Sequence, residues 1–165
     1  AMERSRGVIK EVAAEFSELS GRPFGMIETW GMEDADVAIV VIGSTAGNVR
    51  HVARQLRDSG VKAGVVKVRC FRPFPGAELA KALSGVKAVA VMDRAESFGA
   101  EGGPLFLEVR SALYDLEKRV PLIDYIYGLG GSDVRLDLIE RVFSDLSEIA
   151  SGASAPEGLV YLGSR

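Results

Sequence analysis

The sequence predicts an α/β fold: a three-layer domain built on a mostly parallel, open sheet of about five strands. Two observations predict this class. Between residues 36 and 150, short apolar runs rich in β-branched residues alternate with longer segments whose apolar residues recur at helical spacing. Glycine or proline marks most of the junctions between them. Strand–helix units in succession build parallel sheets with right-handed crossovers and helices on both faces.

The first predicted element is a helix over residues 5–20, because its apolar residues form one stripe at helical spacing. Gly21 and Pro23 end this helix, and residues 26–30 can form a short extended segment. The stripe consists of Val8, Ile9, Val12, Ala13, Phe16 and Leu19.

Four strand–helix units follow. We predict strands at 37–42, 63–70, 86–92 and 121–127; the first is almost wholly β-branched, which suits burial on both faces. The first two helices are predicted at 46–58 and from Pro75 or Gly76 to Leu83. The third is predicted at 103–118, with Pro104 in its first turn, and the fourth runs from an N-cap at Ser132 or Asp133 to about residue 150. Residues 159–162 are too few to place, and can add an edge strand or reach a partner.

Length and composition set the organisation. A chain of 165 residues fits one domain, since about 100–200 residues per domain is usual. We divide it into an N-terminal helix and linker (1–30), a single α/β domain (31–150) and a flexible C-terminal tail (151–165). The net charge is −3, so the chain lacks the basic surface that nucleic-acid-binding domains usually have. No apolar run approaches the roughly 20 residues that span a bilayer. We therefore expect neither a nucleic acid nor a membrane as a partner.

Few residues offer chemistry. The single cysteine, Cys70, excludes an internal disulfide and a Cys-x-x-Cys metal or iron–sulfur site within the chain. A low cysteine content and a charged, helix-like start in place of a signal peptide favour a cytoplasmic location. No residue near His51 completes a nucleophile–base pair. We therefore predict no catalytic residue, metal ligand or cofactor-binding residue in this chain.

The first strand-to-helix loop is a possible anion site, because the free amides of a helix start can hold an anion. Thr45 and Asn48 stand where a dinucleotide fingerprint needs its second and third glycines, and the P-loop pattern also fails. The alternative is a tight turn that lets the helix pack close to the sheet. The candidate residues are Gly43, Ser44, Thr45 and Gly47.

The second loop carries Arg72 between Phe71 and Phe74, next to two prolines. An arginine held this way can make a two-pronged bond to a carboxylate. Its partner can be Asp93 or Glu96 in an internal clamp, or an acid on another subunit. Arg72 and Phe74 are therefore candidates for a subunit or domain contact.

The third loop is the most functional-looking segment of the chain. Charged residues follow a buried strand directly, and three glycines then allow backbone shapes closed to other residues. We predict a subunit or domain contact here; the alternative is a loop closed by internal salt bridges. The candidates are Asp93, Arg94, Glu96, Ser97, Gly99, Gly102 and Gly103.

Six motifs in register, from about residue 21 to residue 133, resemble the C-terminal, transketolase C-terminal-like domain of the alpha subunit of pyruvate:ferredoxin oxidoreductase. The Phe-Arg-Pro-Phe-Pro motif resembles the pyruvate branch more than the 2-oxoglutarate branch. Ser132 stands where many relatives are expected to have arginine. The motifs are Gly21-Arg22, Glu33-Asp34-Ala35, Gly43-Ser44, Phe71-Arg72-Pro73-Phe74-Pro75, Asp93-Arg94 with Ser97-Phe98-Gly99 and Gly103, and Tyr125-x-Tyr127-Gly128-Leu129-Gly130-Gly131.

The resemblance implies a role in a larger enzyme that converts pyruvate and coenzyme A to acetyl-CoA and carbon dioxide and passes electrons to ferredoxin. Thiamine diphosphate, Mg, iron–sulfur clusters and CoA would belong to the whole enzyme, not to this chain. Its partners would be the thiamine-binding part of the alpha subunit and the beta, gamma and delta subunits, with a homodimer also open. Such a domain would support assembly and the active site and would be inactive alone.

Two other readings stay open at this point. The chain can be the equivalent domain of another thiamine-dependent enzyme, such as transketolase or the beta chain of a 2-oxoacid dehydrogenase. It can also be a stand-alone module that binds an anion or nucleotide at the Gly43 or Gly103 helix starts. The 2-oxoacid itself and the oligomeric state of the chain are not determined by the sequence.

Overall fold

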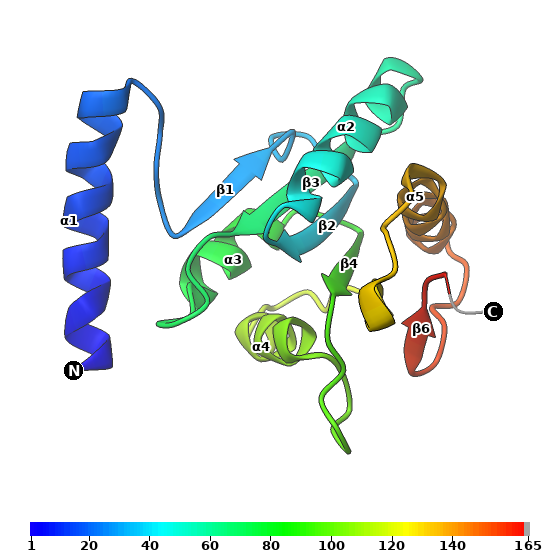
Figure 1. Cartoon of the computed structure of the whole chain (residues 1–165). Coiled ribbons are helices and arrows are strands. Elements are labelled where there is room, and N and C mark those ends of the chain that lie inside the picture. The colour runs from blue at the N-terminus through cyan, green and yellow to red at the C-terminus, as the bar shows by residue number, and fades with distance from the viewer. Residues whose placement is uncertain (164–165) are drawn as a thin grey trace.

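The computed structural model describes residues 1–163, apart from the side chain of Glu3, and is built on a six-stranded sheet (Figure 1). The strand order is β1-β3-β2-β4-β5-β6, and every pair is parallel except β1 with β3. The α/β class and the mostly parallel sheet are therefore confirmed. The strands are β1 Ile27–Trp30, β2 Val37–Ile42, β3 Ala63–Val68, β4 Ala88–Asp93, β5 Leu122–Ile126 and β6 Leu159–Tyr161.

Helices cover both faces of the sheet and complete three layers (Figure 1). On one face, α2 (Thr45–Asp58) and α5 (Leu136–Ala150) pack together; on the other, α3 (Gly76–Leu83) packs beside α4 (Pro104–Leu113). A short 3-10 turn, η1 (Leu129–Gly131), precedes α5. The N-terminal helix α1 (Met2–Ser20) stands to one side of this body. Within residues 1–163, no helix has both the length and the apolarity needed to cross a membrane.

The core follows from the strand sequences. Residues Val37 to Val41 of β2 and all of β4 are buried, because these strands lie in the middle of the sheet with helices on both sides. Alternate side chains point to opposite faces and form two apolar clusters, one under α2 and α5 and the other under α3 and α4.

The sheet has six strands rather than the expected five or so, because two short segments that the sequence left open both form strands. The extended segment at residues 26–30 becomes β1 and joins the sheet antiparallel to β3. Within the expected C-terminal tail, Leu159–Tyr161 forms edge strand β6, with Leu162 buried and its amide bonded to the carbonyl of Ile126 at 2.8 Å. Of the two readings of residues 159–162, the structure shows the edge strand.

Two helix boundaries are corrected. The last helix begins at Leu136 rather than after Ser132 or Asp133, because Ser132 is extended (ψ 140°) after the η1 turn and Arg135 is the N-cap. The fourth helix ends at Leu113, five residues before Lys118. The chain must return from there to the sheet at β5, beside β4, and Pro121 disfavours helix at the residue before it.

Candidate functional site

The carboxyl ends of β2 and β4 mark the point where the sheet reverses its winding. These strands are neighbours, with Val41 opposite Met92. The chain leaves β2 through α2 on one face and leaves β4 through α4 on the other. In open parallel sheets, ligands and partners bind in the crevice outside such a switch point. We therefore looked for the candidate site in the loops that follow these two strands.

A polar hollow of about 490 Å³ lies at this switch point. Three segments meet around it: the start of α2, Arg94 in the loop after β4, and the segment before α5. The hydroxyl of Tyr127 donates a hydrogen bond to Thr45 Oγ1 at 2.9 Å and ties the loop after β5 to α2. The lining residues are Ser44, Thr45, Asn48, Arg94, Tyr127, Asp133 and Val134.

The electrostatics of the hollow follow from these groups. Burial raises the pKa of Tyr127 above its ordinary value, which already keeps the hydroxyl protonated at neutral pH as the donor to Thr45. Arg94 is exposed and lies against the bare backbone of Gly128. A side chain on Gly128 would crowd Arg94, and the residue has φ +65°, so glycine is needed there on two grounds.

Only part of the predicted anion site lines this hollow. Ser44 and Thr45 do, whereas Gly43 forms the turn with φ +79° and Gly47 lies in a separate small hollow beside Trp30. Arg94, predicted as a contact residue, joins Ser44 and Thr45 here. Sequence reasoning did not single out Tyr127 and Asp133 as site residues; their place after β5 was the available signal. Anion binding by this loop stays a prediction.

The third predicted loop is divided by the structure into a buried part and a projecting part. Asp93 is 3% exposed; its Oδ1 accepts the amide of Leu105 at 3.1 Å and its Oδ2 accepts the amide of Phe106 at 2.8 Å. Asp124 Oδ2 accepts the amide of Gly103 at 2.6 Å. Two buried carboxylates, from β4 and β5, thus satisfy amides at the start of α4. Asp93, counted among the contact candidates, has an internal role.

Gly102 and Gly103 are also used inside the domain. A Cβ on Gly103 would overlap the carboxylate of Asp93, and one on Gly102 would overlap the ring of Phe106. Both glycines are buried. Their lack of a side chain allows the start of α4 to approach the sheet closely. Whether they also take part in a subunit or domain contact stays a prediction.

The projecting part is the segment between these two fixed ends, and its role as a subunit or domain contact stays a prediction. The β4–α4 loop reaches away from the body in Figure 1, Gly99 turns it with φ +71°, and the amide of Ala100 bonds to the carbonyl of Ser97 at 3.0 Å. The neighbouring carboxylate of Glu96 raises the pKa of the Tyr161 hydroxyl. At the tip, Phe98 is fully exposed. A large apolar side chain in this position gains most when a partner covers it.

Arg72 forms an internal ion pair, but not with the acids expected. Its Nη2 lies 2.6 Å from Glu108 Oε1 on α4, and its guanidinium stacks on Phe71, 4.3 Å from the ring centre. The partner is neither Asp93, which caps α4, nor Glu96. Phe74 packs against the core cluster under α3 and α4 and meets Phe71 edge to face. The intersubunit alternative for Arg72 stays a prediction.

Replacing Arg72 by alanine should cost little stability. The Arg72 and Glu108 side chains are 49% and 33% exposed, and such surface pairs contribute about 0–1 kcal/mol. We expect the free energy of unfolding in urea to fall by less than about 1 kcal/mol. A loss of about 3–5 kcal/mol, the range for a broken buried pair, would show that the clamp holds the domain together.

The described residues offer several groups that can bind a polar partner. Between residues 1 and 163, no three His, Cys, Asp or Glu side chains gather where they could hold a metal ion. The hollow offers a cation, hydroxyl groups and a carboxylate, which are groups that recognise polar partners. The projecting loop adds an exposed aromatic residue.

Comparison with known families identifies the domain. Residues 35–139 match the model of pyruvate:ferredoxin oxidoreductase core domain II. The chain is 45% identical over 145 residues to pyruvate synthase subunit PorA of Thermotoga maritima, covering 88% of this chain and 37% of that subunit. It is 43% identical over 150 residues to ketoisovalerate oxidoreductase subunit VorA of Pyrococcus horikoshii, covering 90% and 38%.

A further relative covers nearly the whole chain. The alpha subunit of NADH-dependent phenylglyoxylate dehydrogenase of Aromatoleum evansii is 36% identical over 162 residues, which is 98% of this chain and 39% of that subunit. The chain therefore spans less than two-fifths of the length of these three relatives.

Solved structures agree on the fold. A split-gene transketolase, an inactive beta4 tetramer, superposes with a TM-score of 0.56 at 18% identity, over 75% of this chain and 41% of that one. The 2-oxoglutarate:ferredoxin oxidoreductase of Magnetococcus marinus was solved with 2-oxoglutarate, coenzyme A and succinyl-CoA bound. It superposes with a TM-score of 0.53 at 22% identity, over 79% of this chain and 21% of that chain. With residues 35–139 matched and relatives above 40% identity, this chain belongs to the family of core domain II of 2-oxoacid:ferredoxin oxidoreductase alpha subunits.

Proposed function

We propose that this chain works as the C-terminal domain of the alpha subunit of a pyruvate:ferredoxin oxidoreductase, where it supports subunit assembly and the active site without supplying a catalytic group. Pyruvate is favoured over other 2-oxoacids by the 45% identity to a pyruvate synthase subunit and by the Phe-Arg-Pro-Phe-Pro motif at 71–75. Relatives named for ketoisovalerate and phenylglyoxylate define the competing substrates. We keep the division into a helix and linker, one α/β domain and a C-terminal segment as part of this proposal, with strands β1 and β6 of the sheet lying outside residues 31–150.

The projecting loop after β4 is the observation that carries the assembly role. Asp93, Gly102 and Gly103 fix its two ends to the sheet and to α4, so the segment between them is presented from a rigid base. The tip carries Phe98, fully exposed. Aromatic anchors of this kind dominate the energetics of protein interfaces.

In this proposal, other domains and subunits of the whole enzyme bind its cofactors, and this chain binds none. Thiamine diphosphate would supply the carbanion chemistry when bound, and CoA, Mg and iron–sulfur clusters would act with it on other domains and subunits. The residues of this domain would hold those neighbours in position. The partners are accordingly the thiamine-binding part of the alpha subunit and the other subunits, with ferredoxin reached through the complex.

Replacing Phe98 by serine in the complete enzyme should weaken its assembly. An interface aromatic is commonly worth about 2 kcal/mol, or roughly 30-fold in affinity. The measurement is the dissociation constant of the subunits by analytical ultracentrifugation, together with kcat/KM for pyruvate, 2-ketoisovalerate and phenylglyoxylate. Tyr114→Ser, which removes another exposed ring outside the loop, is the matched control.

The outcomes separate the parts of the proposal. Equal assembly of Phe98→Ser, Tyr114→Ser and the unmodified enzyme would remove the contact role of the loop. A kcat/KM that favours 2-ketoisovalerate or phenylglyoxylate would correct the substrate. Failure to oxidise any 2-oxoacid would contradict the enzyme assignment itself.

A further inference from the structure

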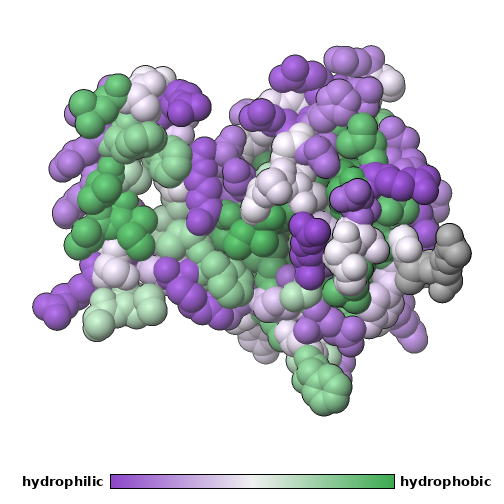
Figure 2. Space-filling model, in the orientation of Figure 1, coloured by the Kyte–Doolittle hydropathy of each residue, from purple (hydrophilic) through white to green (hydrophobic). Residues whose placement is uncertain are grey.

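Helix α1 leaves an apolar stripe uncovered. Val8 and Val12 are each 57% exposed, Phe16 44% and Leu19 87%, and their spacing places them on one side of the helix. Only Ala13 of the predicted apolar stripe is buried. Figure 2 shows this apolar surface over α1, beside the body of the domain. Contiguous exposed apolar surface of this kind marks an interaction site.

The stripe continues into a groove between α1 and the sheet. This groove holds about 450 Å³ and is almost wholly apolar in lining. Phe24, 48% exposed, forms one wall and meets Phe16 edge to face, with 5.1 Å between ring centres. Stripe and groove thus form one docking surface, which we call the α1 surface. Its residues are Val8, Ile9, Val12, Ala13, Phe16, Leu19, Phe24, Gly25, Met26, Arg69 and Cys70.

The position of α1 is set by polar contacts at both of its ends. Near the start, Lys10 pairs with Glu78 on α3 at 2.7 Å and Arg6 donates to the carbonyl of Phe74 at 2.8 Å. Near the end, the amide of Phe24 donates to Ser17 Oγ at 2.8 Å. These contacts hold the helix beside the body and leave its stripe open along the groove.

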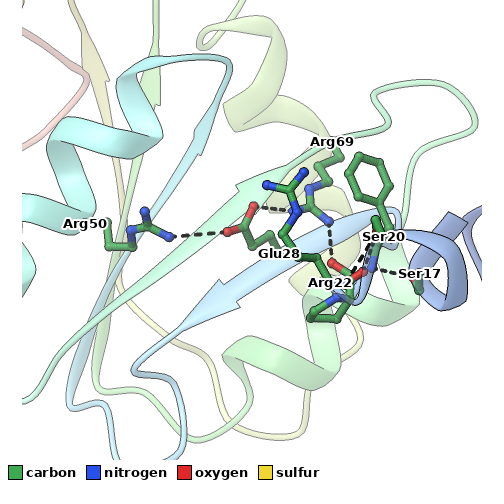
Figure 3. A network of polar contacts seen from close by, with 8 residues as sticks. Ser17, Ser20, Arg22, Glu28, Arg50 and Arg69 are labelled. Carbon is green, nitrogen blue, oxygen red and sulfur yellow. Dashed lines mark hydrogen bonds and ion pairs between the residues drawn. The ribbon is translucent and has the colours of Figure 1, made fainter.

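Arg69 secures the linker after α1 in the same way (Figure 3). Its guanidinium pairs with Glu28 on β1 at 2.6 Å, donates to the carbonyl of Pro23 at 3.3 Å and lies over the ring of Phe24. Figure 3 shows Glu28 between Arg69 and Arg50. The α1 surface is therefore preorganised, which lowers the entropic cost of binding a partner.

Charge along the rim indicates what kind of partner fits. Glu11, Glu15 and Glu18 are exposed and follow helical spacing along one edge of the stripe, with the exposed Arg4 at the start of the same row. A second copy packed stripe to stripe about a two-fold axis would place this acidic row against its own copy. Like charges so placed are destabilising, so the fitting partner is a different surface, with lysine or arginine beside an apolar ridge.

The relatives indicate where such a surface is found. The match to the phenylglyoxylate dehydrogenase subunit spans 162 residues and so takes in the region of α1, yet covers 39% of that subunit. The core domain II model begins at residue 35 and leaves α1 out. In that relative the corresponding segment belongs to a subunit more than twice as long as this chain.

We propose that the α1 surface docks onto another domain of the same alpha subunit, through an apolar ridge of that domain bordered by basic side chains. The inference rests on the proposed function, which supplies the larger subunit. It adds a second contact, on the opposite side of the domain II body from the strands β5 and β6.

The test introduces a glutamate at two exposed positions of α1 in the complete enzyme. Val12→Glu places the charge in the stripe, whereas Ala14→Glu places it on the outer side of the helix and serves as the matched control. Val12→Glu should weaken subunit assembly by about tenfold or more, measured by analytical ultracentrifugation, while Ala14→Glu leaves assembly unchanged. Thermal unfolding of the 165-residue chain alone should be the same for both variants.

Each other outcome has a definite meaning. Equal assembly of the two variants overturns the inference, and 2-oxoacid oxidation retained in the same samples leaves the proposed function standing. If Val12→Glu assembles more weakly than Ala14→Glu but the enzyme oxidises no 2-oxoacid, the docking surface is supported and the proposed function is contradicted. A dimer of the isolated chain that Val12→Glu dissociates overturns the inference in favour of a second copy.

Discussion

Replacing Gly103 by alanine is expected to destabilise the domain by about 2–4 kcal/mol, the combined effect of overpacking and a lost helix cap. The new Cβ would overlap the carboxylate of Asp93. That carboxylate cannot move aside without releasing the amides of Leu105 and Phe106, which it accepts at the start of α4. Urea-induced unfolding, followed by circular dichroism, measures the loss.

Gly47→Ala is the matched control for this substitution. Gly47 lies inside α2, and a Cβ there meets nothing within 4 Å. Alanine should stabilise that helix by about 0.5–1 kcal/mol. If Gly103→Ala also left the domain unchanged or more stable, the packing of α4 on the Asp93 carboxylate would be wrong.

Replacing Asp124 by asparagine should remove a large pH dependence of stability. Burial raises the pKa of Asp124 from 3.8 to about 6, the amide of Gly103 partly offsets this, and the nearby carboxylate of Asp93 adds to it. The residue is 1% exposed, and its Oδ1 has no hydrogen-bond partner among residues 1–163. An ionised carboxylate is therefore poorly accommodated in the folded domain.

The sign follows from proton linkage. Because the folded domain holds this proton more tightly than the unfolded chain, its stabilising effect is full below pH 3.8 and is lost as the pH rises through about 6. A shift from 3.8 to about 6 corresponds to about 2–3 kcal/mol. Asparagine cannot ionise, so Asp124→Asn should gain about that much relative to the unmodified chain between pH 4 and pH 7.

The measurement is the difference in unfolding free energy between the two proteins across this pH range. Asp115→Asn, at an exposed position, is the control for the same substitution outside the core. A difference for Asp124→Asn that stays constant across the pH range would mean that Asp124 ionises normally in the folded domain. Burial raises the pKa of Asp93 too, so some pH dependence should remain in Asp124→Asn.

Local sequence patterns predicted most of the elements. The β-branched run at residues 37–42 and the periodic segment at 46–58 are features of the chain itself, and they appear as β2 and α2 nearly where expected. The two edge strands were harder to predict from the sequence, because β1 has only four residues and β6 only three. Such short pieces are strands only when the sheet supplies a neighbour to pair with.

The candidate site was found in part, for a related reason. Loops that leave buried strands are recognisable from sequence, so the segments at 43–47 and 93–103 were correctly singled out as strand exits. Which side chains meet across those loops depends on strand order. Arg94 joins Ser44 and Thr45 because β2 and β4 are neighbours, and Arg72 meets Glu108 because α4 packs beside α3.

By itself, then, the sequence determined the α/β class, the family resemblance and the loop that projects after β4, since each is carried by residues close together in the chain. Only the tertiary structure decided the use of Asp93 and Asp124 as paired caps of α4 and the exposure of the α1 stripe. A carboxylate inside a predicted strand carries no local sign of what it will face, and an apolar stripe carries no sign of whether its own domain will cover it. Both depend on the packing of segments distant in sequence.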